Sequence, residues 1–325
     1  IELLVVIAII ALLIGILLPS LAAARESARQ IKAAANGRSV AQGVAVYSTS
    51  GKQYFPPHYV YASGPETMAW NFDDQQTSNP NPANGYVHWS YALFNDGNVS
   101  EASFSNPGML RGGLPATNPG PLAKNWEDGQ VNDLGATAGG QFPNDRQVKR
   151  MAFVGNAALF PRNKFYASPG ERKNELVRDA DVQNPSNVIL ITEINPVRNY
   201  DLWKVGGLIK SHRPVTPFVG GSSGTQVYSE PAGGFSRYFY PRLTNILPLE
   251  QIPVSAIDGF TDTDLNCVGR LWGGKQQGEG GRTNFAFVDG HVETTTLKET
   301  IEKKRWGDRF WSMTGSDGVN MNTAP

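Results

Sequence analysis

The chain has 325 residues, including 35 glycines and 22 prolines, and it carries 29 basic and 29 acidic side chains. This balanced charge excludes the basic excess typical of nucleic-acid-binding proteins, so no nucleic-acid partner is expected. The single cysteine, Cys267, excludes an intrachain disulfide framework. Glycine and proline are more frequent than in average proteins, which predicts a loop-rich body.

An unbroken apolar run, Leu3–Leu18, follows a single acid, Glu2. As a helix this run spans roughly 24 Å, somewhat less than the about 30 Å of a bilayer core. A cleaved signal peptide is the alternative, with Ala22–Ala24 as its small-residue cleavage site. We expect residues 1–24 to form a membrane-spanning or filament-core helix.

The carboxylate of Glu2 needs its own explanation. An acid inside a membrane helix costs about 2.5–3.5 kcal/mol on insertion scales, and less near the interface. Either Glu2 lies at the headgroup boundary and stays hydrated, or it pairs with a cation on another subunit. The physical argument leaves both alternatives open.

Pro19 predicts a kink or a local unwinding of this helix between Gly15 and Pro19. The proline ring has no N–H group and clashes with the carbonyl group four residues back, which belongs to Gly15. Gly15 is itself a poor helix former. A simple membrane anchor gains little from a helix that can bend here, whereas a subunit that packs among copies of itself can use this flexibility.

Beyond Pro19 we expect the helix to resume and to run to about Ser48. Residues 25–50 are predicted to be an amphipathic continuation that packs against a head, residues 51–325. The packed stripe is predicted from small and apolar residues at three- to four-residue spacing, namely Ala24, Ala28, Ile31, Ala35, Val40, Val44 and Tyr47.

The head is expected to be one elaborated domain, because no clean linker divides it. Val188–Thr192 is the strongest predicted strand, since it is β-branched and apolar. Tyr86–Phe94 is an aromatic island that predicts a short buried helix or strand, and Thr296–Trp306 predicts a short surface helix. The expected fold class is α+β, with the long N-terminal helix packed on a head that contains an antiparallel β-sheet.

Two further segments, Phe285–Val288 and His291–Thr294, predict a β-hairpin. Asp289 and Gly290 lie between them, and an Asp-Gly pair is typical of a two-residue type I′ turn. This pair is therefore expected to serve as turn chemistry.

The first eleven residues, together with Glu2 and Pro19, resemble the N-terminal segment of type IV pilins and of type II secretion pseudopilins. The resemblance implies that a prepilin peptidase cuts a basic leader shortly before this motif, and that the new first residue is a methylated phenylalanine. The present sequence begins a few residues later than the mature form of that family. The resemblance also implies that Glu2 pairs with the N-terminal amine of a neighbouring subunit and that Pro19 is the helix-breaking proline.

A second segment, Thr283–Val292, resembles the tail of a large pilin-like family found in bacteria such as planctomycetes. In that tail a histidine is followed by nine residues and then by Asp-Gly. Asp289 and Gly290 are present here, whereas Glu279 stands at the histidine position. The segment Pro185–Glu193 also resembles part of that family.

The resemblance implies a structural subunit of a type IV pilus-like filament at the bacterial cell surface, built from identical subunits by the pilus assembly machinery. Before assembly the subunit would be a single-pass protein of the inner membrane. Arg25, Arg29, Lys32 and Arg38 outnumber Glu26 beyond the apolar run, so the positive-inside rule predicts the opposite orientation. We follow the motif.

Two alternatives keep the same anchor. A minor pseudopilin of a type II secretion system would use the same helix without forming long fibres of itself. A membrane-anchored surface binding module would stay monomeric and would use the seven tryptophans and eleven tyrosines of the chain.

No set of residues in the head predicts catalysis, so the protein is not expected to be an enzyme. The segment 220–224 matches the nucleophile-elbow pattern. That elbow requires a helix directly after it, and the residues that follow are poor helix formers. The four histidines lie far apart in the sequence without metal-ligand spacing and are expected to be packing or surface residues: His58, His88, His212 and His291.

Asp258, Asp262, Asp264 and Asn266 form one oxygen-rich cluster, and calcium prefers such ligands. The spacing does not fit an EF-hand loop, so a solvated acidic loop is the preferred interpretation. Calcium at these aspartates is the one cofactor considered, and otherwise no cofactor is expected. Asn98 begins an Asn-Val-Ser triplet, the acceptor pattern for N-glycosylation.

Overall fold

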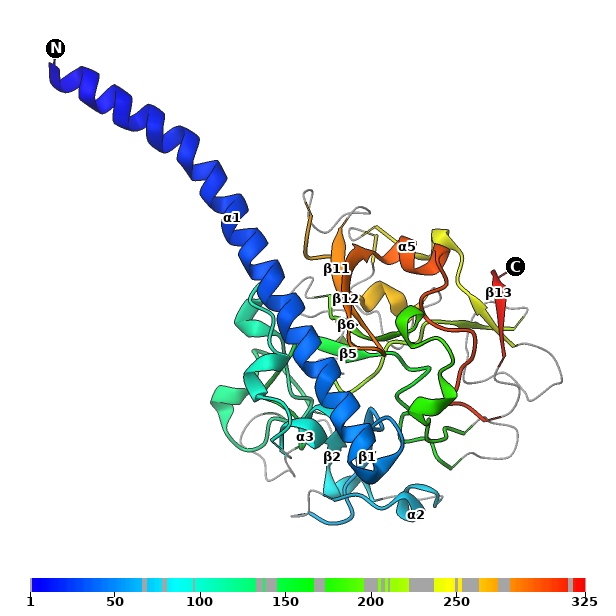
Figure 1. Cartoon of the computed structure of the whole chain (residues 1–325). Coiled ribbons are helices and arrows are strands. Elements are labelled where there is room, and N and C mark those ends of the chain that lie inside the picture. Colours follow the sequence, from blue (N-terminus) through cyan, green and yellow to red (C-terminus); the bar gives the residue numbers. More distant parts are fainter. Residues whose placement is uncertain are drawn as a thin grey trace.

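A long helix, α1 (Glu2–Tyr47), and a β-rich head make up the computed structural model of the chain (Figure 1). This architecture confirms the α+β class. The structure describes residues 2–65, 69–77, 81–95, 97–132, 137, 145–166, 173–195, 204–205, 208–209, 211–221, 237–248, 251–252, 263–273, 281–314 and 318–324.

Helix α1 runs without interruption through Gly15 and Pro19, so the expected local unwinding is absent there. Pro19 offers no N–H group to the carbonyl of Gly15. Next to it, the hydroxyl of Ser20 donates a hydrogen bond to the carbonyl oxygen of Leu17 at 2.8 Å. Figure 1 shows the helix bowed, with its N-terminal part inclined to the part that lies along the head. Of the two predicted alternatives, a kink or a local unwinding, the structure therefore shows a bend within continuous helix.

The α-helix ends at Tyr47, close to the predicted end at Ser48. It continues into one π-helical turn, η1 (Ser48–Lys52). Gln53 follows in the left-handed region with a φ of 60°, and its N–H group donates to the carbonyl of Ser48. The chain then leaves the helix for the head.

The C-terminal half of α1 buries one face, which consists of Ala33, Gly37, Val40, Ala41, Gly43, Val44 and Tyr47. The lower half of the predicted stripe is therefore confirmed. The upper half was wrong, because Ala24, Ala28, Ile31 and Ala35 are exposed. Ile31 and Ala35 lie two residues from Ala33, and about 100° of rotation per residue places them on the opposite side of the helix.

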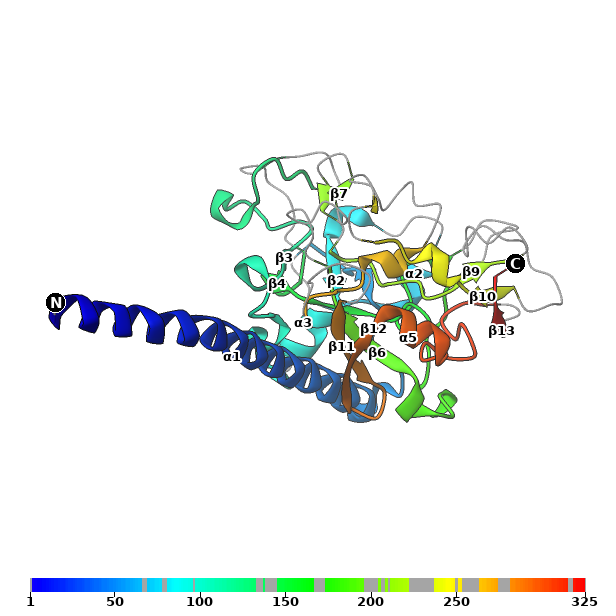
Figure 2. The same cartoon turned by 90° about the horizontal axis from the view of Figure 1, so that it is seen from above.

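A four-stranded antiparallel sheet supports α1, in the order β12-β11-β6-β5. Helix α1 packs against three of its strands, β11, β6 and β12. Figure 2 shows α1 along one side of the head, with its N-terminal half projecting beyond it. The four strands are β5 (Phe153–Gly155), β6 (Ile189–Glu193), β11 (Arg282–Phe287) and β12 (Val292–Thr296).

Strand β6 is the strand predicted at Val188–Thr192, displaced by one residue, and its five residues are all buried. The short helix α5 (Leu297–Glu302) lies within the predicted segment Thr296–Trp306. The hydroxyl of Thr296 caps this helix by accepting a hydrogen bond from the N–H group of Glu299 at 3.2 Å. Three predicted elements of the head, counting the β11–β12 hairpin, are thus confirmed.

The turn of this hairpin differs from the predicted type. A type I′ turn needs a positive φ at both Asp289 and Gly290, but only Gly290 has one, at 87°. Gly290 N donates to Phe287 O at 2.9 Å, and Phe287 N donates to His291 O at 2.9 Å. Three residues therefore connect the strands, as in a type I turn followed by a left-handed glycine. Asp289 also stabilises this turn, because its Oδ1 accepts a hydrogen bond from His291 N at 3.1 Å.

The other described strands are short. Antiparallel pairs join β1 to β2, β3 to β4 and β7 to β8, while β10 lies between antiparallel β9 and parallel β13. Their bounds are β1 (Tyr59–Tyr61), β2 (Tyr86–His88), β3 (Leu114–Pro115), β4 (Arg150–Met151), β7 (Lys204–Val205), β8 (Leu208–Ile209), β9 (Val219–Gly220), β10 (Tyr238–Tyr240) and β13 (Val319–Thr323).

Short helical turns connect these strands. The α-helical ones are α2 (Phe72–Gln75) and α3 (Trp89–Phe94), so the aromatic island at Tyr86–Phe94 forms both a strand and a helix. The 3₁₀ turns are η2 (Pro82–Asn84), η3 (Glu101–Phe104), η4 (Leu110–Gly112), η5 (Ala123–Asn125), η6 (Asp179–Asp181), η7 (Pro185–Asn187), η9 (Leu243–Asn245) and η11 (Asp264–Cys267).

Candidate functional site: the exposed half of helix α1

The N-terminal half of α1 projects from the head (Figure 1), and its apolar side chains are uncovered. Fourteen large apolar residues between Leu3 and Leu21 are each 49–74% exposed. Monomeric soluble proteins rarely expose a continuous apolar patch of more than a few hundred Å². Within the described residues, α1 is the one helix long and apolar enough to cross a membrane. Such a helix indicates a membrane anchor or a signal sequence.

The three predicted assembly residues lie on this half of the helix. Glu2 is exposed in the first turn of α1. A side chain added at Gly15 would meet nothing within 4 Å, so this position is clear of the head. Pro19 is also exposed. The roles of Glu2, Gly15 and Pro19 in assembly stay predictions.

Basic side chains follow the apolar half. Arg25, Arg29 and Lys32 are exposed, and their spacing of four and three residues places them on one face of α1. Along the axis they begin about 35 Å from Glu2. The apolar half is thus bounded by one acid at its tip and by three cations at its base.

Hydrogen bonds and one close approach hold the other half of α1 on the head. Asn36 Nδ2 donates to Ser105 O at 2.7 Å, and directly after α1 the Ser48 Oγ of η1 donates to Asp179 Oδ2 at 2.8 Å. A β-carbon added at Gly43 would lie 2.0 Å from a methyl carbon of Val99, so only glycine permits this packing. The exposed half therefore projects from a helix whose remainder is anchored at several points.

A buried carboxylate, Glu193, lies at the end of β6 beneath α1 and is fully inaccessible to solvent. Its Oε1 accepts from the side-chain amides of Asn106 and Asn284, each at 2.9 Å. Its Oε2 accepts from Trp272 Nε1 and Thr283 Oγ1 at 2.8 Å, and from Asn284 N at 3.0 Å. Burial raises the pKa of Glu193, while these donors lower it.

Glu193 was not among the residues predicted from the sequence, although a signal was present. An acid that ends a β-branched, largely apolar strand is rarely left unpaired, because burying a carboxylate without hydrogen bonds is costly. The donors come from three separate segments, namely Asn106, Trp272 and the adjacent pair Thr283 and Asn284 of β11. The tertiary fold brings these donors together, and their spacing along the sequence does not predict it.

Three of the four histidines come together in the head. The rings of His58 and His88 are 4.9 Å apart, and His58 Nδ1 lies 2.9 Å from the carbonyl oxygen of His212. His212 Nδ1 contacts Thr117 Oγ1 at 2.7 Å. Burial lowers the pKa of His58 to about 3 and that of His88 well below its usual value. The rings of His58 and His88 are therefore neutral packing groups.

The fourth histidine, His291, lies at the β11–β12 turn. Its ring stacks on Phe287 at 4.2 Å, and its Nδ1 lies 2.5 Å from Asp289 Oδ1. Asp289 of the turn therefore contacts the side chain of His291, the residue that follows Gly290.

The proposed calcium cluster is only partly within the described residues. Asp258 and Asp262 lie outside them, as do Glu279 and residues 222–224 of the rejected nucleophile elbow. Asp264 is hydrogen-bonded to Thr216, and burial raises its pKa. Among the described residues no group of three or more acids, histidines or cysteines is arranged to hold a metal ion.

Asn266, the fourth member of that cluster, is fully buried and serves the fold. Its Oδ1 accepts from Leu247 N at 3.0 Å and from Arg270 Nη2 at 3.1 Å, while its Nδ2 donates to Asn245 O at 2.9 Å. These contacts occupy its amide. Cys267, the next residue, is also buried.

Asn98, the candidate glycosylation residue, is exposed. It lies at a shallow groove between the segment before η3 and residues Ser39, Gln42 and Val46 of α1. A glycan on Asn98 would therefore lie beside the helix.

The exposed apolar helix and the β-rich head together are compatible with a pilin-like layout. In this layout the helix carries the apolar surface and the head carries the loops. Comparisons of the chain with protein-family models, with curated proteins and with solved structures found no match.

Proposed function

We propose that this protein is a structural subunit of a type IV pilus-like helical filament and polymerises through the exposed half of α1. One observation carries the proposal, namely the fourteen uncovered apolar side chains on a helix whose other half is packed on the head. The resemblance of residues 1–11 to pilin N-termini supports it. The role is structural, and it needs no cofactor.

Burial of the apolar surface would drive polymerisation. Removing apolar surface from water contributes about 25 cal/mol per Å², and side chains on every side of α1 are available for contacts between copies. The apolar halves form the core of the filament, and the loop-rich heads coat it at the cell surface.

Glu2 would enter this core with its charge. An unpaired charge in a low-dielectric core is strongly unfavourable, so a cation must lie beside it. In the proposed filament the cation is the N-terminal amine of a neighbouring copy. The pair then fixes the axial register of one helix against the next.

Before assembly the same surface would lie in the inner membrane as a single span, after a prepilin peptidase has removed a basic leader. Arg25, Arg29 and Lys32 would then lie at the headgroup level, where basic side chains can reach lipid phosphates. The pilus assembly machinery would extract the subunit from this state.

A minor pseudopilin of a type II secretion system is the alternative that shares the anchor. A membrane-anchored binding module is the alternative that stays monomeric. Electron microscopy of sheared surface material separates these functions, because only a major subunit forms long fibres of itself.

The decisive variant is Glu2→Ala, tested in cells that carry the assembly machinery. We expect filament yield to fall sharply, while the unfolding transition of the detergent-solubilised variant stays unchanged. Glu302→Ala is the matched control, because Glu302 is an exposed acid on α5 of the head. Normal filaments from Glu2→Ala, or equal losses from both variants, would contradict the proposal.

A further inference from the structure

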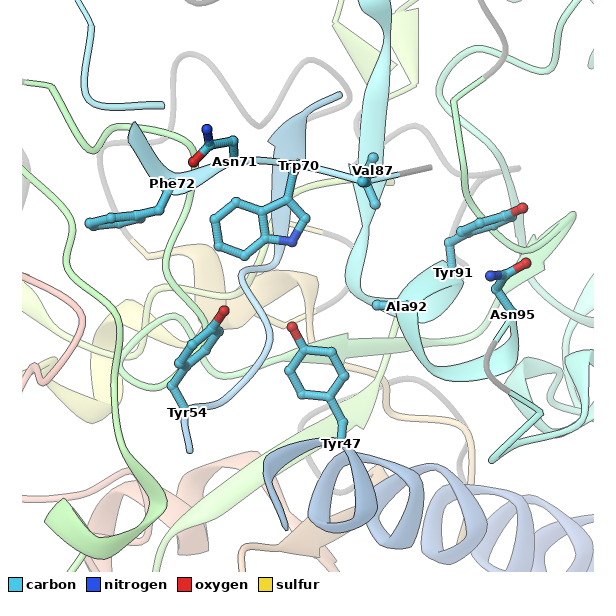
Figure 3. A pocket seen from close by; sticks show the side chains of 10 residues that line it. Tyr47, Tyr54, Trp70, Asn71, Phe72, Val87, Tyr91, Ala92 and Asn95 are labelled. Atoms are coloured by element: carbon cyan, nitrogen blue, oxygen red, sulfur yellow. The ribbon is translucent and has the colours of Figure 1, made fainter. Parts of the chain in front are cut away.

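A pocket of about 310 Å³ lies where the end of α1 meets β2 and α3 (Figure 3). Five aromatic residues line it: Tyr47 of α1, Tyr54 and Trp70 of the following loops, Phe72 of α2 and Tyr91 of α3. Its volume falls within the range of small-molecule sites, which is about 300–1,000 Å³. None of the polar or apolar groups in this pocket belongs to the exposed half of α1.

The rings stand at steep angles to one another. The ring of Tyr54 is inclined by 70° to that of Tyr47 and by 69° to that of Trp70, with centroids 6.4 and 6.5 Å apart. Figure 3 shows the hydroxyl groups of Tyr47 and Tyr54 pointing toward Trp70. Trp70 is only partly buried, and it is one of the residues that line the pocket.

The polar groups at the pocket are neutral. Asn71 and Asn95 are exposed at its rim, and the hydroxyl groups of Tyr47 and Tyr54 are hydrogen-bonded to each other. Burial raises the pKa of Tyr54 and of Tyr91, so both phenols stay protonated at neutral pH. None of the described residues that line the pocket is charged.

We propose that this pocket binds a neutral sugar ring, one pyranose unit of a cell-surface or extracellular glycan. A pyranose has an apolar C–H face that packs on an aromatic ring such as Trp70. Its hydroxyl groups both donate and accept hydrogen bonds, and amide and phenol side chains do the same. The lining of Tyr47, Tyr54, Trp70 and Asn95 offers both kinds of contact within one cavity.

A quaternary ammonium group is the competing ligand, because aromatic cages bind such cations. The electron-rich rings suit either ligand. The neutral amides and hydroxyls at the rim suit the sugar better, since a quaternary ammonium group has no hydrogen bond to offer them. The two ligands give opposite results in the experiment below.

The location of the pocket agrees with a ligand outside the cell. Tyr47 lies about 68 Å along α1 from Glu2, at the far end of the helix from the apolar half. Bundling of the apolar halves would leave this end with the head. All ten described residues that line the pocket belong to one chain, so failure of polymerisation would not remove it.

The test is ligand-observed NMR on the full chain in a polyoxyethylene detergent, which contains neither a sugar nor a quaternary ammonium group. The probes are the methyl glycosides of glucose, galactose, mannose and N-acetylglucosamine, and tetramethylammonium chloride. We expect at least one glycoside to bind saturably with a Kd on the order of 1 mM, and tetramethylammonium not to bind.

Variants locate the binding. Trp70→Ala should weaken it by about tenfold or more, and Asn95→Ala by a few-fold, whereas Tyr166→Ala should leave it unchanged. Tyr166 is the matched control because it is an aromatic residue, 46% exposed, that does not line the pocket. Where Trp70→Ala disturbs folding, Trp70→Phe keeps an aromatic face and should retain partial binding.

Three results would overturn the assignment. One is the absence of saturable binding by all four glycosides to the folded chain. Another is equal binding by the wild type and by the folded Trp70 and Asn95 variants. The third is binding of tetramethylammonium in place of the sugars, which would make the pocket a cation cage.

Discussion

Asn284 holds Glu193 by two hydrogen bonds, from its backbone N–H group to Oε2 at 3.0 Å and from its side-chain amide to Oε1 at 2.9 Å. The same amide lies 3.5 Å from the carbonyl oxygen of Gln30 on α1. Thr294 Oγ1 of β12 donates to Asn284 Oδ1 at 2.6 Å. One residue therefore connects the buried carboxylate, the edge strand and the long helix.

Replacing Glu193 by glutamine should destabilise the head. Each carboxylate oxygen accepts hydrogen bonds from at least two donors. In glutamine an NH₂ group replaces one of these oxygens, so the donors that face this group lose their acceptor. At about 1–3 kcal/mol for each unsatisfied buried group, we expect a loss of about 3 kcal/mol in the free energy of unfolding. Chemical unfolding in detergent, followed by tryptophan fluorescence, measures this loss.

The control for that experiment is Glu302→Gln, because Glu302 is an exposed acid on α5. Surface substitutions of this kind usually change stability by no more than about 0.5 kcal/mol. Equal free energies for the two variants would show that the five hydrogen bonds to Glu193 do not stabilise the head.

The buried histidines should make the head sensitive to acid. Burial lowers the pKa of His58 from 6.5 to about 3, so in the folded state it stays neutral while the unfolded chain takes up a proton below about pH 6.5. The free energy of unfolding should therefore fall as the pH drops from about 6.5 toward 3, by about 1.4 kcal/mol per pH unit for each such group. His88 should add to this slope.

His88→Asn tests the contribution of one ring. The side chain of His88 caps α3 by accepting a hydrogen bond from Ser90 N, and asparagine can provide the same cap. The variant should show a slope lower by about one proton between pH 6 and 4. An identical pH dependence in the variant and the wild type would contradict this account.

Gly43→Ala should loosen the contact between α1 and the head. The new β-carbon would lie 2.0 Å from Val99 Cγ2, and the β-branched Val99 is stiff and buried. Overpacking of this kind costs typically about 1–3 kcal/mol. Gly15→Ala is the matched control, because nothing lies within 4 Å of its added carbon.

Adding Val99→Ala to Gly43→Ala should recover part of the loss, because it removes the clashing methyl group. Thermal unfolding of the three variants in detergent provides the comparison. A Gly43→Ala protein as stable as Gly15→Ala would show that the helix does not approach the head this closely.

Cys267 should resist modification in the folded protein. Its side chain is buried, and burial, with a smaller contribution from Asp264, raises the pKa of its thiol well above the usual value. The reactive thiolate is therefore both scarce and inaccessible. Iodoacetamide should label the unfolded chain quickly and the folded chain hardly at all, as read by mass spectrometry. Rapid labelling without denaturant would contradict the buried position.

The long helix and the central hairpin could be predicted because their signals are local. The apolar run from Leu3 to Leu18 and the strand at Val188–Thr192 depend on the residues within each segment alone. Pro19 shows the limit of such reasoning. The residues around it predicted a kink or a local unwinding, and only the structure showed that the helix bends while it stays continuous.

The burial stripe could be predicted only in part. Val40, Val44 and Tyr47 are buried because this part of α1 packs on the head, and α1 as a whole contacts β11, β6 and η3. Ile31 has equal hydrophobicity but faces away from the head. Which side of a helix is buried depends on the surface that it meets, and alanine-rich turns give no preference for one side.

By itself the sequence determined a long apolar helix with one acid at its start, an α+β head and the position of its central hairpin. These follow from local hydrophobicity and turn chemistry. Only the tertiary structure decided that Glu193 meets five donors, that three distant histidines form one cluster, and that Tyr47, Tyr54, Trp70 and Tyr91 enclose a pocket. The reason is physical, because such contacts join segments whose separation along the chain contains no information about their distance in space.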